Sequence, residues 1–220
     1  MTKKQRAALI VAALENEYPA PTPGLDYSEK DAWQLLVAVR LAAQCTDARV
    51  NVVTPALYAR YPSPPALAAA DVKDIEAIIY TCGLGATKAR DIKACMQMLT
   101  GDFGGHVPDT MEDLLKLPGV GRKSANLVLG DIYGKPAIVC DTHCIRISNR
   151  LGLIDTKNPA VAEKQLRQII EPEKGNDFCH RLVLHGRAVC TARGYTCGRC
   201  CLNNLCPTAK IDNNLTTTAV

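Results

Sequence analysis

The sequence predicts an all-α fold, and three observations support that prediction. Apolar residues recur at helical spacing through nearly all of the 220 residues. No stretch alternates apolar and polar residues over a useful length, and no internal repeat is present, so neither a sheet nor a solenoid is expected. Prolines and glycines separate the periodic stretches, and those at 19–23 form a stiff linker where we expect a domain boundary.

Caps and breakers place the individual helices. The first is expected over 3–17, and a largely buried helix follows between Ser28 and Leu41 because its apolar residues cover more than one face. A third runs from Thr46 towards Tyr58 and carries Pro55 as an expected break. The later helices are expected over 66–80 (one or two pieces), 87–99, 111–115, from the 117–125 stretch to Gly134, 141–151, 159 onward and 176–190.

Composition and charge are those of an ordinary globular chain, with 47% hydrophobic and 22% charged residues. Aromatic residues make up only 5%, so a stacking platform for single-stranded nucleic acid is not expected. The region 174–210 holds six lysines and arginines against one aspartate, which suits a polyanionic partner. No apolar run of about 18 residues and no signal peptide is found, so we expect an intracellular protein with reduced cysteines.

A helix–hairpin–helix is expected around Leu-Pro-Gly-Val-Gly-Arg-Lys-Ser-Ala at 117–125. Its glycines permit a tight turn, and the free N–H groups that open the next helix, together with its dipole, form an anion site. A nucleotide-binding P-loop is excluded because Arg122 precedes Lys123 where glycine is required, and a dinucleotide fingerprint is excluded because no strand precedes the turn. The remaining interpretation is a hairpin that binds the DNA backbone through its amides without recognising sequence.

Two roles are open for Lys123 within this hairpin. The commoner role for a lysine there is a solvated phosphate contact. The alternative is an amine nucleophile, whose pKa the neighbouring Arg122 and the helix N-terminus are both expected to lower. A nucleophile of this kind needs a carboxylate partner, and Asp141 is the candidate, although a plain N-cap is the simpler role for it.

Five of the eleven cysteines lie between 190 and 206. Four of these form a regular frame, C-x6-C-x2-C-x5-C: Cys190, Cys197, Cys200 and Cys206. Such a frame can bind zinc or a [4Fe–4S] cluster, and the single close pair favours iron–sulfur because structural zinc usually shows two close pairs. The metal would stabilise a loop that has no core of its own, and Arg193 in that loop would then contact phosphate.

These motifs, in this order, resemble the endonuclease III family of DNA glycosylase/AP lyases, which belongs to the helix–hairpin–helix Gly-Pro-Asp superfamily. The resemblance rests on residues 117–125, on Asp-Thr-His at 141–143, and on the cysteine frame, and it covers nearly the whole chain. The loop that contains Gln44 and the turn that contains Leu84 also match the family's two DNA-inserting segments.

The resemblance implies a role for each of these residues. Lys123 would attack C1′ of the damaged nucleotide, expel the base and form a Schiff base, after which β-elimination cuts the strand 3′ to the site. Asp141 would activate the lysine or stabilise positive charge on the sugar. Gln44 and Leu84 would fill the space left by the flipped nucleotide. The remaining DNA contacts are expected from Gly119, Val120, Gly121, Arg122 and Arg193, and the four frame cysteines would carry the [4Fe–4S] cluster.

The implied substrate is duplex DNA with an oxidised pyrimidine or an abasic site. Related enzymes that excise adenine have a similar hairpin without its lysine, so the presence of Lys123 favours an enzyme with both glycosylase and lyase activity. Alternatives remain: the same fold acting on a T·G mismatch, a pyrimidine dimer or abasic sites only, or a non-catalytic DNA-binding module. Two residues depart from the family pattern: Gly85 stands where a larger, often aromatic residue is usual, and Cys45 where alanine is common.

The resemblance also implies an architecture. Residues 24–134 would form a six-helix barrel domain that contains the helix–hairpin–helix at about 111–131. Residues 1–23 and 135–210 would form an iron–sulfur cluster domain, and 211–220 a tail. DNA would bind in a cleft between the two domains. We expect a bacterial-type, cytoplasmic, nucleoid-associated monomer with no membrane partner.

Overall fold

The computed structural model describes residues 1–28 and 31–209, and within these ranges it contains helices and turns but no strand, which confirms the predicted all-α class. The chain divides into two compact units, Pro23–Lys135 and Met1–Thr22 joined by Pro136 onward. The tail predicted at 211–220 lies outside the described residues. None of the helices described here has both the length and the apolar character that crossing a membrane requires.

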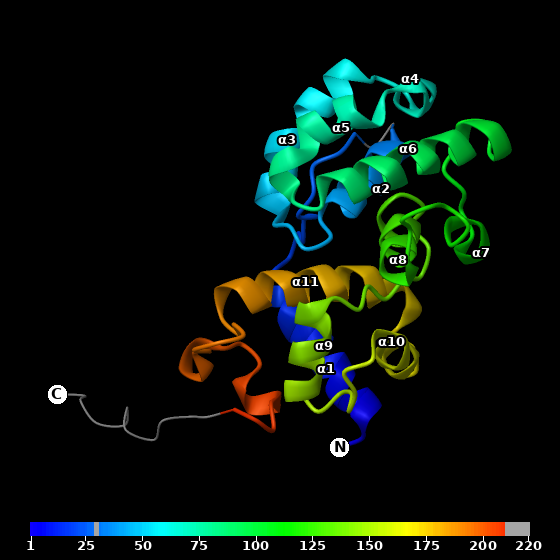
Figure 1. The fold of residues 1–220 in the computed structure, drawn as a ribbon. Coiled ribbons are helices and arrows are strands. Elements are labelled where there is room, and N and C mark those ends of the chain that lie inside the picture. The colour runs from blue at the N-terminus through cyan, green and yellow to red at the C-terminus, as the bar shows by residue number, and fades with distance from the viewer. Residues whose placement is uncertain (29–30, 210–220) are drawn as a thin grey trace. The chain divides into compact units, whose positions relative to one another are not determined.

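The unit Pro23–Lys135 is built around one buried helix. Its elements are α2 (Ala32–Leu41), α3 (Asp47–Arg60), α4 (Pro64–Ala69), α5 (Val72–Ile79), the 3₁₀ turn η1 (Tyr80–Cys82), α6 (Gly85–Asp102), α7 (Met111–Leu114) and α8 (Arg122–Asp131). As predicted, α2 is buried on more than one face, and it contacts α3, α6 and α8 (Figure 1). The helix that contacts α4 and α5 is α6, whose buried stripe runs from Lys88 to Leu99.

The predicted break at Pro55 is wrong. Helix α3 continues through this proline to Arg60. Pro55 lies on the exposed side of α3, whereas Val53 and Leu57 face the core. The backbone carbonyl that loses its N–H donor therefore lies on the side of the helix that water reaches, and the apolar contacts of the other face hold the helix together.

The second unit joins the first helix of the chain to the last three α-helices that the structure describes and to three 3₁₀ turns. Its elements are α1 (Lys3–Glu17), α9 (Thr142–Arg150), α10 (Pro159–Arg167), η2 (Pro172–Lys174), α11 (Gly175–Ala188), η3 (Cys197–Arg199) and η4 (Asn203–Leu205). Helix α11 contacts both α1 and α9, with Phe178 and Leu182 fully buried (Figure 1). The predicted start of α10 is confirmed, since the Asn158 side chain accepts from the Ala160 N–H at 2.9 Å and Pro159 is the first helical residue.

Candidate functional site

The predicted helix–hairpin–helix is present as α7, a tight turn and α8. Leu114 and Leu117 on one side of the turn and Ala125 and Val128 on the other are buried in the core of their unit. Within the turn, the Val120 N–H donates to the Leu117 carbonyl at 3.1 Å. The half-buried Val120 side chain packs against the core, so the turn is fixed by the protein's own contacts.

Only glycine fits at position 119. Its φ of +75° lies in the left-handed region, and a Cβ there would stand 2.8 Å from Cδ of Arg40. The Arg40 guanidinium is fixed by Asp91, whose Oδ2 accepts from Nε at 2.8 Å and from Nη2 at 2.5 Å. The turn therefore lies directly against a partly buried ion pair.

Gly121 differs from Gly119 in that the fold does not require it. It is the N-cap of α8 with φ of −100° and ψ of 175°, a conformation open to other residues. A Cβ at this position would meet no atom within 4 Å. The backbone N–H groups of Lys123 and Ser124 donate to none of the residues in the described ranges, as expected for the first turn of a helix. An anion could approach these donors without a clash.

Lys123 and Arg122 are both exposed at this helix N-terminus. The Arg122 carbonyl accepts from Nδ2 of Asn126 at 3.2 Å. The side chain of Lys123 forms no hydrogen bond or ion pair with any residue that the structure describes, so its amine is sterically available to a ligand.

Asp141 belongs to the other unit and caps α9. Its Oδ1 accepts from the Cys144 N–H at 2.6 Å, which confirms the predicted N-cap. No residue within the described ranges donates to its Oδ2, so half of the carboxylate is available for another partner. Because Lys123 and Asp141 lie in separate units, the structure defines the surroundings of each one by itself.

The two residues expected to insert into DNA share an unusual backbone conformation. Gln44 has φ of 57° and Leu84 has φ of 52°, and they are the two non-glycine residues with positive φ in the described part of the chain. Both side chains are exposed, Leu84 to 56%. Strained backbone of this type clusters at functional sites. Gly85 is one of the two residues that depart from the family pattern. A Cβ at this position would come within 3.2 Å of the Glu76 side chain, so the nearest atom that a larger residue would displace belongs to a flexible side chain.

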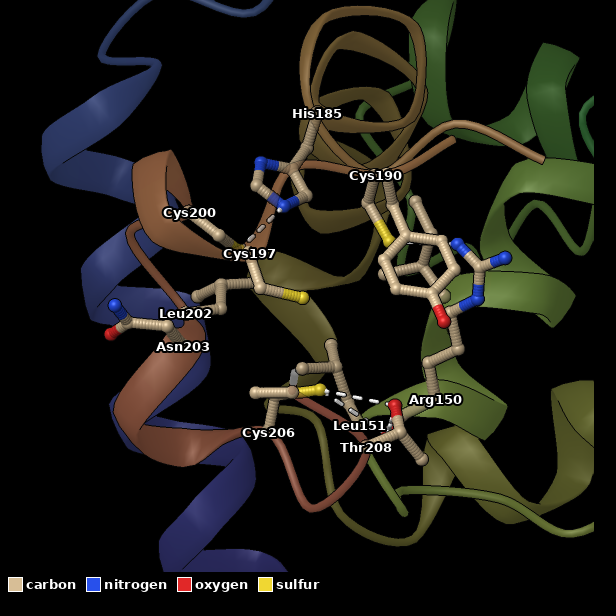
Figure 2. A pocket seen from close by; sticks show the side chains of 13 residues that line it. Arg150, Leu151, His185, Cys190, Cys197, Cys200, Leu202, Asn203, Cys206 and Thr208 are labelled. Carbon is tan, nitrogen blue, oxygen red and sulfur yellow. Dashed lines mark hydrogen bonds between the residues drawn. The ribbon is translucent and has the colours of Figure 1, made fainter. Parts of the chain in front are cut away.

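The four frame cysteines line one pocket (Figure 2). Figure 2 shows the sulfur atoms of Cys190, Cys197 and Cys206 turned toward its interior. The pocket has a cavity volume of about 30 Å³, more than a water molecule needs, so it is a real space and not a packing defect. All four thiols are free and half-buried. Between 190 and 206, Leu202 is the only buried residue.

Arg150 and His185 contact the frame thiols from α9 and α11. Nη1 of Arg150 donates to Sγ of Cys190 at 3.2 Å and to the Thr191 carbonyl at 2.8 Å. Nε2 of His185 lies 3.3 Å from Sγ of Cys200, and its Nδ1 lies 3.1 Å from the Tyr18 hydroxyl. Burial lowers the pKa of His185, which favours a neutral imidazole with a single N–H. Both contacts position sulfur atoms, and Arg150 also places positive charge beside Cys190.

Arg193 lies on an exposed part of the cysteine loop, between the first two frame cysteines. Its carbonyl accepts from the Thr191 hydroxyl at 2.6 Å, and Gly194 beside it has φ of +76°. The side chain is therefore carried on a tight local turn at the surface.

Sequence reasoning missed the buried Lys88 and the ion pair of Arg40 with Asp91. A signal for Lys88 exists, because three buried residues of α6 follow it at helical spacing: Ile92 at i+4, Cys95 at i+7 and Leu99 at i+11. The ion pair has no comparable signal, because its members are 51 residues apart.

Comparisons with known proteins identify the family of this chain and solved structures with the same fold. A family model described as "HhH-GPD superfamily base excision DNA repair protein" matches residues 37–172. Over 210 residues the chain is 46% identical to endonuclease III of Synechocystis sp., covering 95% of each chain.

Two solved structures are similar to this chain, each with a TM-score of 0.89 and 37% identity over 95% of it. One is described as a non-covalent endonuclease III–DNA complex and is covered to 97% of its length. The other is a trapped covalent endonuclease III–DNA intermediate, covered to 98%.

Proposed function

This chain belongs to the endonuclease III family of DNA glycosylase/AP lyases, and from that premise we propose that Lys123 is the nucleophile with which it removes oxidised pyrimidines from duplex DNA. The observation that carries the proposal is the exposed Lys123 amine at the start of α8, beside unpaired backbone donors and bonded to no described residue. A phosphate held by those donors would place the adjoining sugar within reach of the amine.

The chemistry follows from an amine nucleophile. The neutral Nζ of Lys123 forms a bond to C1′, and the base leaves with the electron pair of the glycosidic bond and takes up a proton. Nζ then loses a proton, its lone pair breaks the C1′–O4′ bond to open the sugar ring, and O4′ takes up a proton, which leaves a protonated Schiff base between Nζ and C1′. Loss of a proton from C2′ then expels the 3′ phosphate and cuts the strand by β-elimination, and water finally releases the lysine.

Asp141 is proposed as the carboxylate partner. One of its oxygens is used to cap α9, which fixes the side chain, while the other is left available. An ionised carboxylate beside the reacting sugar would stabilise positive charge as the base departs or accept the proton of the ammonium. Its role requires the two units to meet on the DNA, and that meeting is part of the proposal.

The remaining contacts with DNA divide into backbone and wedge contacts. The turn formed by Gly119, Val120 and Gly121 would contact phosphate through its amides, and Arg122 and Arg193 through charge. Gln44 and Leu84 would fill the gap in the duplex, because flipping a nucleotide costs a few kcal/mol that an inserted side chain partly offsets. None of these contacts recognises a base edge, as suits an enzyme that searches any sequence.

The four frame cysteines are proposed to hold a [4Fe–4S] cluster. The donor set fits, since four free thiols line one pocket and Arg150 lies beside them. A [4Fe–4S] cluster takes one thiolate at each of its four irons, which matches the number of frame cysteines. When bound, the cluster would cross-link the loop at four points and so fix Arg193 at the surface.

Trapping with borohydride tests the proposal. The protein is incubated with sodium borohydride and duplexes that carry thymine glycol, dihydrouracil, an abasic site, a T·G mismatch or a pyrimidine dimer. We expect covalent complexes on the first three duplexes and none with Lys123→Ala. Trapping on the mismatch or the dimer instead would change the proposed substrate, and the absence of trapping on every duplex would contradict the lyase activity.

A further inference from the structure

Lys88 lies in an unusual position for a lysine. It is fully buried in the first turns of α6, on the stripe that faces the core. Its Nζ donates to the Leu41 carbonyl at 2.8 Å and to the Cys82 carbonyl at 2.8 Å. Leu41 is the last residue of α2 and Cys82 the last of η1, so one ammonium group meets the negative ends of two helical elements.

Each of these carbonyls immediately precedes a turn with strained backbone. Gln44 lies three residues beyond Leu41, and Leu84 lies two residues beyond Cys82. The backbone N–H of Lys88 also donates to the Leu84 carbonyl at 3.0 Å. Non-glycine residues keep positive φ only when their surroundings over-determine it, and Lys88 contacts the backbone of both turns.

The two turns also meet through their thiols. Burial, followed by the charge of the Cys45 thiol and its hydrogen bond, raises the pKa of Cys82 to about 11. Cys45 is the residue after Gln44, so its contact with Cys82 joins the same two turns that Lys88 bridges. The contact of Cys45 with Cys82 and the buried side chain of Lys88 thus join the two turns from inside the unit.

We propose that Lys88 is a positioning residue that holds the turns of Gln44 and Leu84 in the conformation that enters DNA. The proposal rests on the function proposed above, since both turns are assigned there as wedges. Without the ammonium, two buried carbonyls lose their donor, and both turns can relax from positive φ. Lys88 would then affect the reaction only through the two wedges and would not touch the substrate.

Fluorescence of 2-aminopurine tests this positioning role directly. The probe base is placed opposite a tetrahydrofuran abasic analogue, which cannot form a Schiff base, so the result does not depend on Lys123 chemistry. Saturating wild-type protein should unstack the probe and raise its fluorescence, whereas Lys88→Met should give little rise. The matched control, Lys93→Met on the same helix, should behave as wild type. Thermal unfolding establishes that each variant is folded.

Single-turnover β-elimination on a duplex with a true abasic site gives the second readout. Lys88→Met should lower the rate about 10²-fold, the cost of misplacing groups at a reacting centre. In a background that already carries Gln44→Ala and Leu84→Ala, the same change should cost less than about threefold, because residues that act together are not additive. Lys88→Gln keeps a donor for one carbonyl and should fall between wild type and Lys88→Met; it replaces Lys88→Met if that variant does not fold.

Two results would overturn the proposal. One is a folded Lys88→Met protein with the wild-type rise in fluorescence and the wild-type rate. The other is a loss that stays undiminished when both wedges are already removed, since Lys88 would then act by a different route. Failure of the wild-type protein to cut the abasic duplex would count against the proposed function alone, because the tetrahydrofuran measurement still decides the role of Lys88.

Discussion

The hairpin turn and the cysteine loop are both short segments with little regular helix, yet they are stabilised in opposite ways. The hairpin turn is fixed by four buried apolar residues and lies against the ion pair of Arg40 with Asp91. The cysteine loop has one buried residue, Leu202, and two 3₁₀ turns. Its thiols line a pocket in which no side chain fills the centre.

The difference separates two kinds of site. The hairpin is preorganised by the protein, so a phosphate that binds there need not order the turn. The cysteine loop has too little core to hold its own fold, so its order should depend on a bound group. Each prediction below tests one side of this comparison, from the largest expected effect to the smallest.

The largest effect is expected from the loss of a frame cysteine. Cys197→Ser should lower bound iron from about four atoms per chain to well below that value, because a [4Fe–4S] cluster needs all four thiolates. Hydrogen exchange in 190–209 should then become fast, while the hairpin stays protected. Elemental analysis and exchange mass spectrometry measure both. The control is Cys201→Ser, an exposed cysteine outside the frame, which should keep its iron; equal iron in both variants would contradict the assignment.

Gly119→Ala should destabilise the unit that contains the hairpin by about 2–4 kcal/mol, from the positive φ together with the clash against Arg40. Denaturant unfolding followed by circular dichroism measures the loss. A variant as stable as wild type would show that the turn is free to move, which would remove the basis for calling the hairpin preorganised.

Arg40→Met should cost about 1–3 kcal/mol in the same measurement, because it leaves Asp91 without its charged donor in a partly buried place. Lys116→Met, which removes exposed ion pairs on the other side of the turn, serves as the control and should change stability by less than about 1 kcal/mol. An equal effect of the two changes would mean that Arg40 gives the turn no special support.

Gly121→Ala should leave stability nearly unchanged, because a Cβ there meets nothing. The added methyl group should keep phosphate from approaching position 121, so binding to an abasic duplex should weaken about tenfold. This is the effect of losing part of one charge-assisted hydrogen bond, which is worth about 1.5–3 kcal/mol. Fluorescence anisotropy at fixed salt measures the dissociation constant. Wild-type affinity in this variant would show that phosphate does not approach position 121.

Much of the fold could be predicted from the sequence because its signals are local. Helical spacing of apolar residues located the helices, and α7, α9 and α10, which are capped by Thr110, Asp141 and Asn158, begin within one residue of the expected positions. Pro55 misled because the cost of a proline depends on which side of the helix it lies, and the sequence around it does not give that side directly.

The parts of the site that could not be predicted depend on distant partners. Helical spacing signals the burial of Lys88, but its acceptors could not be predicted because they are backbone carbonyls, one of them 47 residues away. Arg40 is likewise an ordinary helical arginine until Asp91 and Gly119 are brought against it. The four cysteines were predictable as a group because their spacing lies within one short segment.

The most direct test of the central claim is to locate the covalent bond. Wild-type protein is trapped with borohydride on a thymine glycol duplex, digested with nuclease and protease, and analysed by tandem mass spectrometry. The reduced sugar remnant should lie on Nζ of Lys123, in the peptide that begins after Arg122. A remnant on any other amine, such as Lys116 or the N-terminus, would contradict the account.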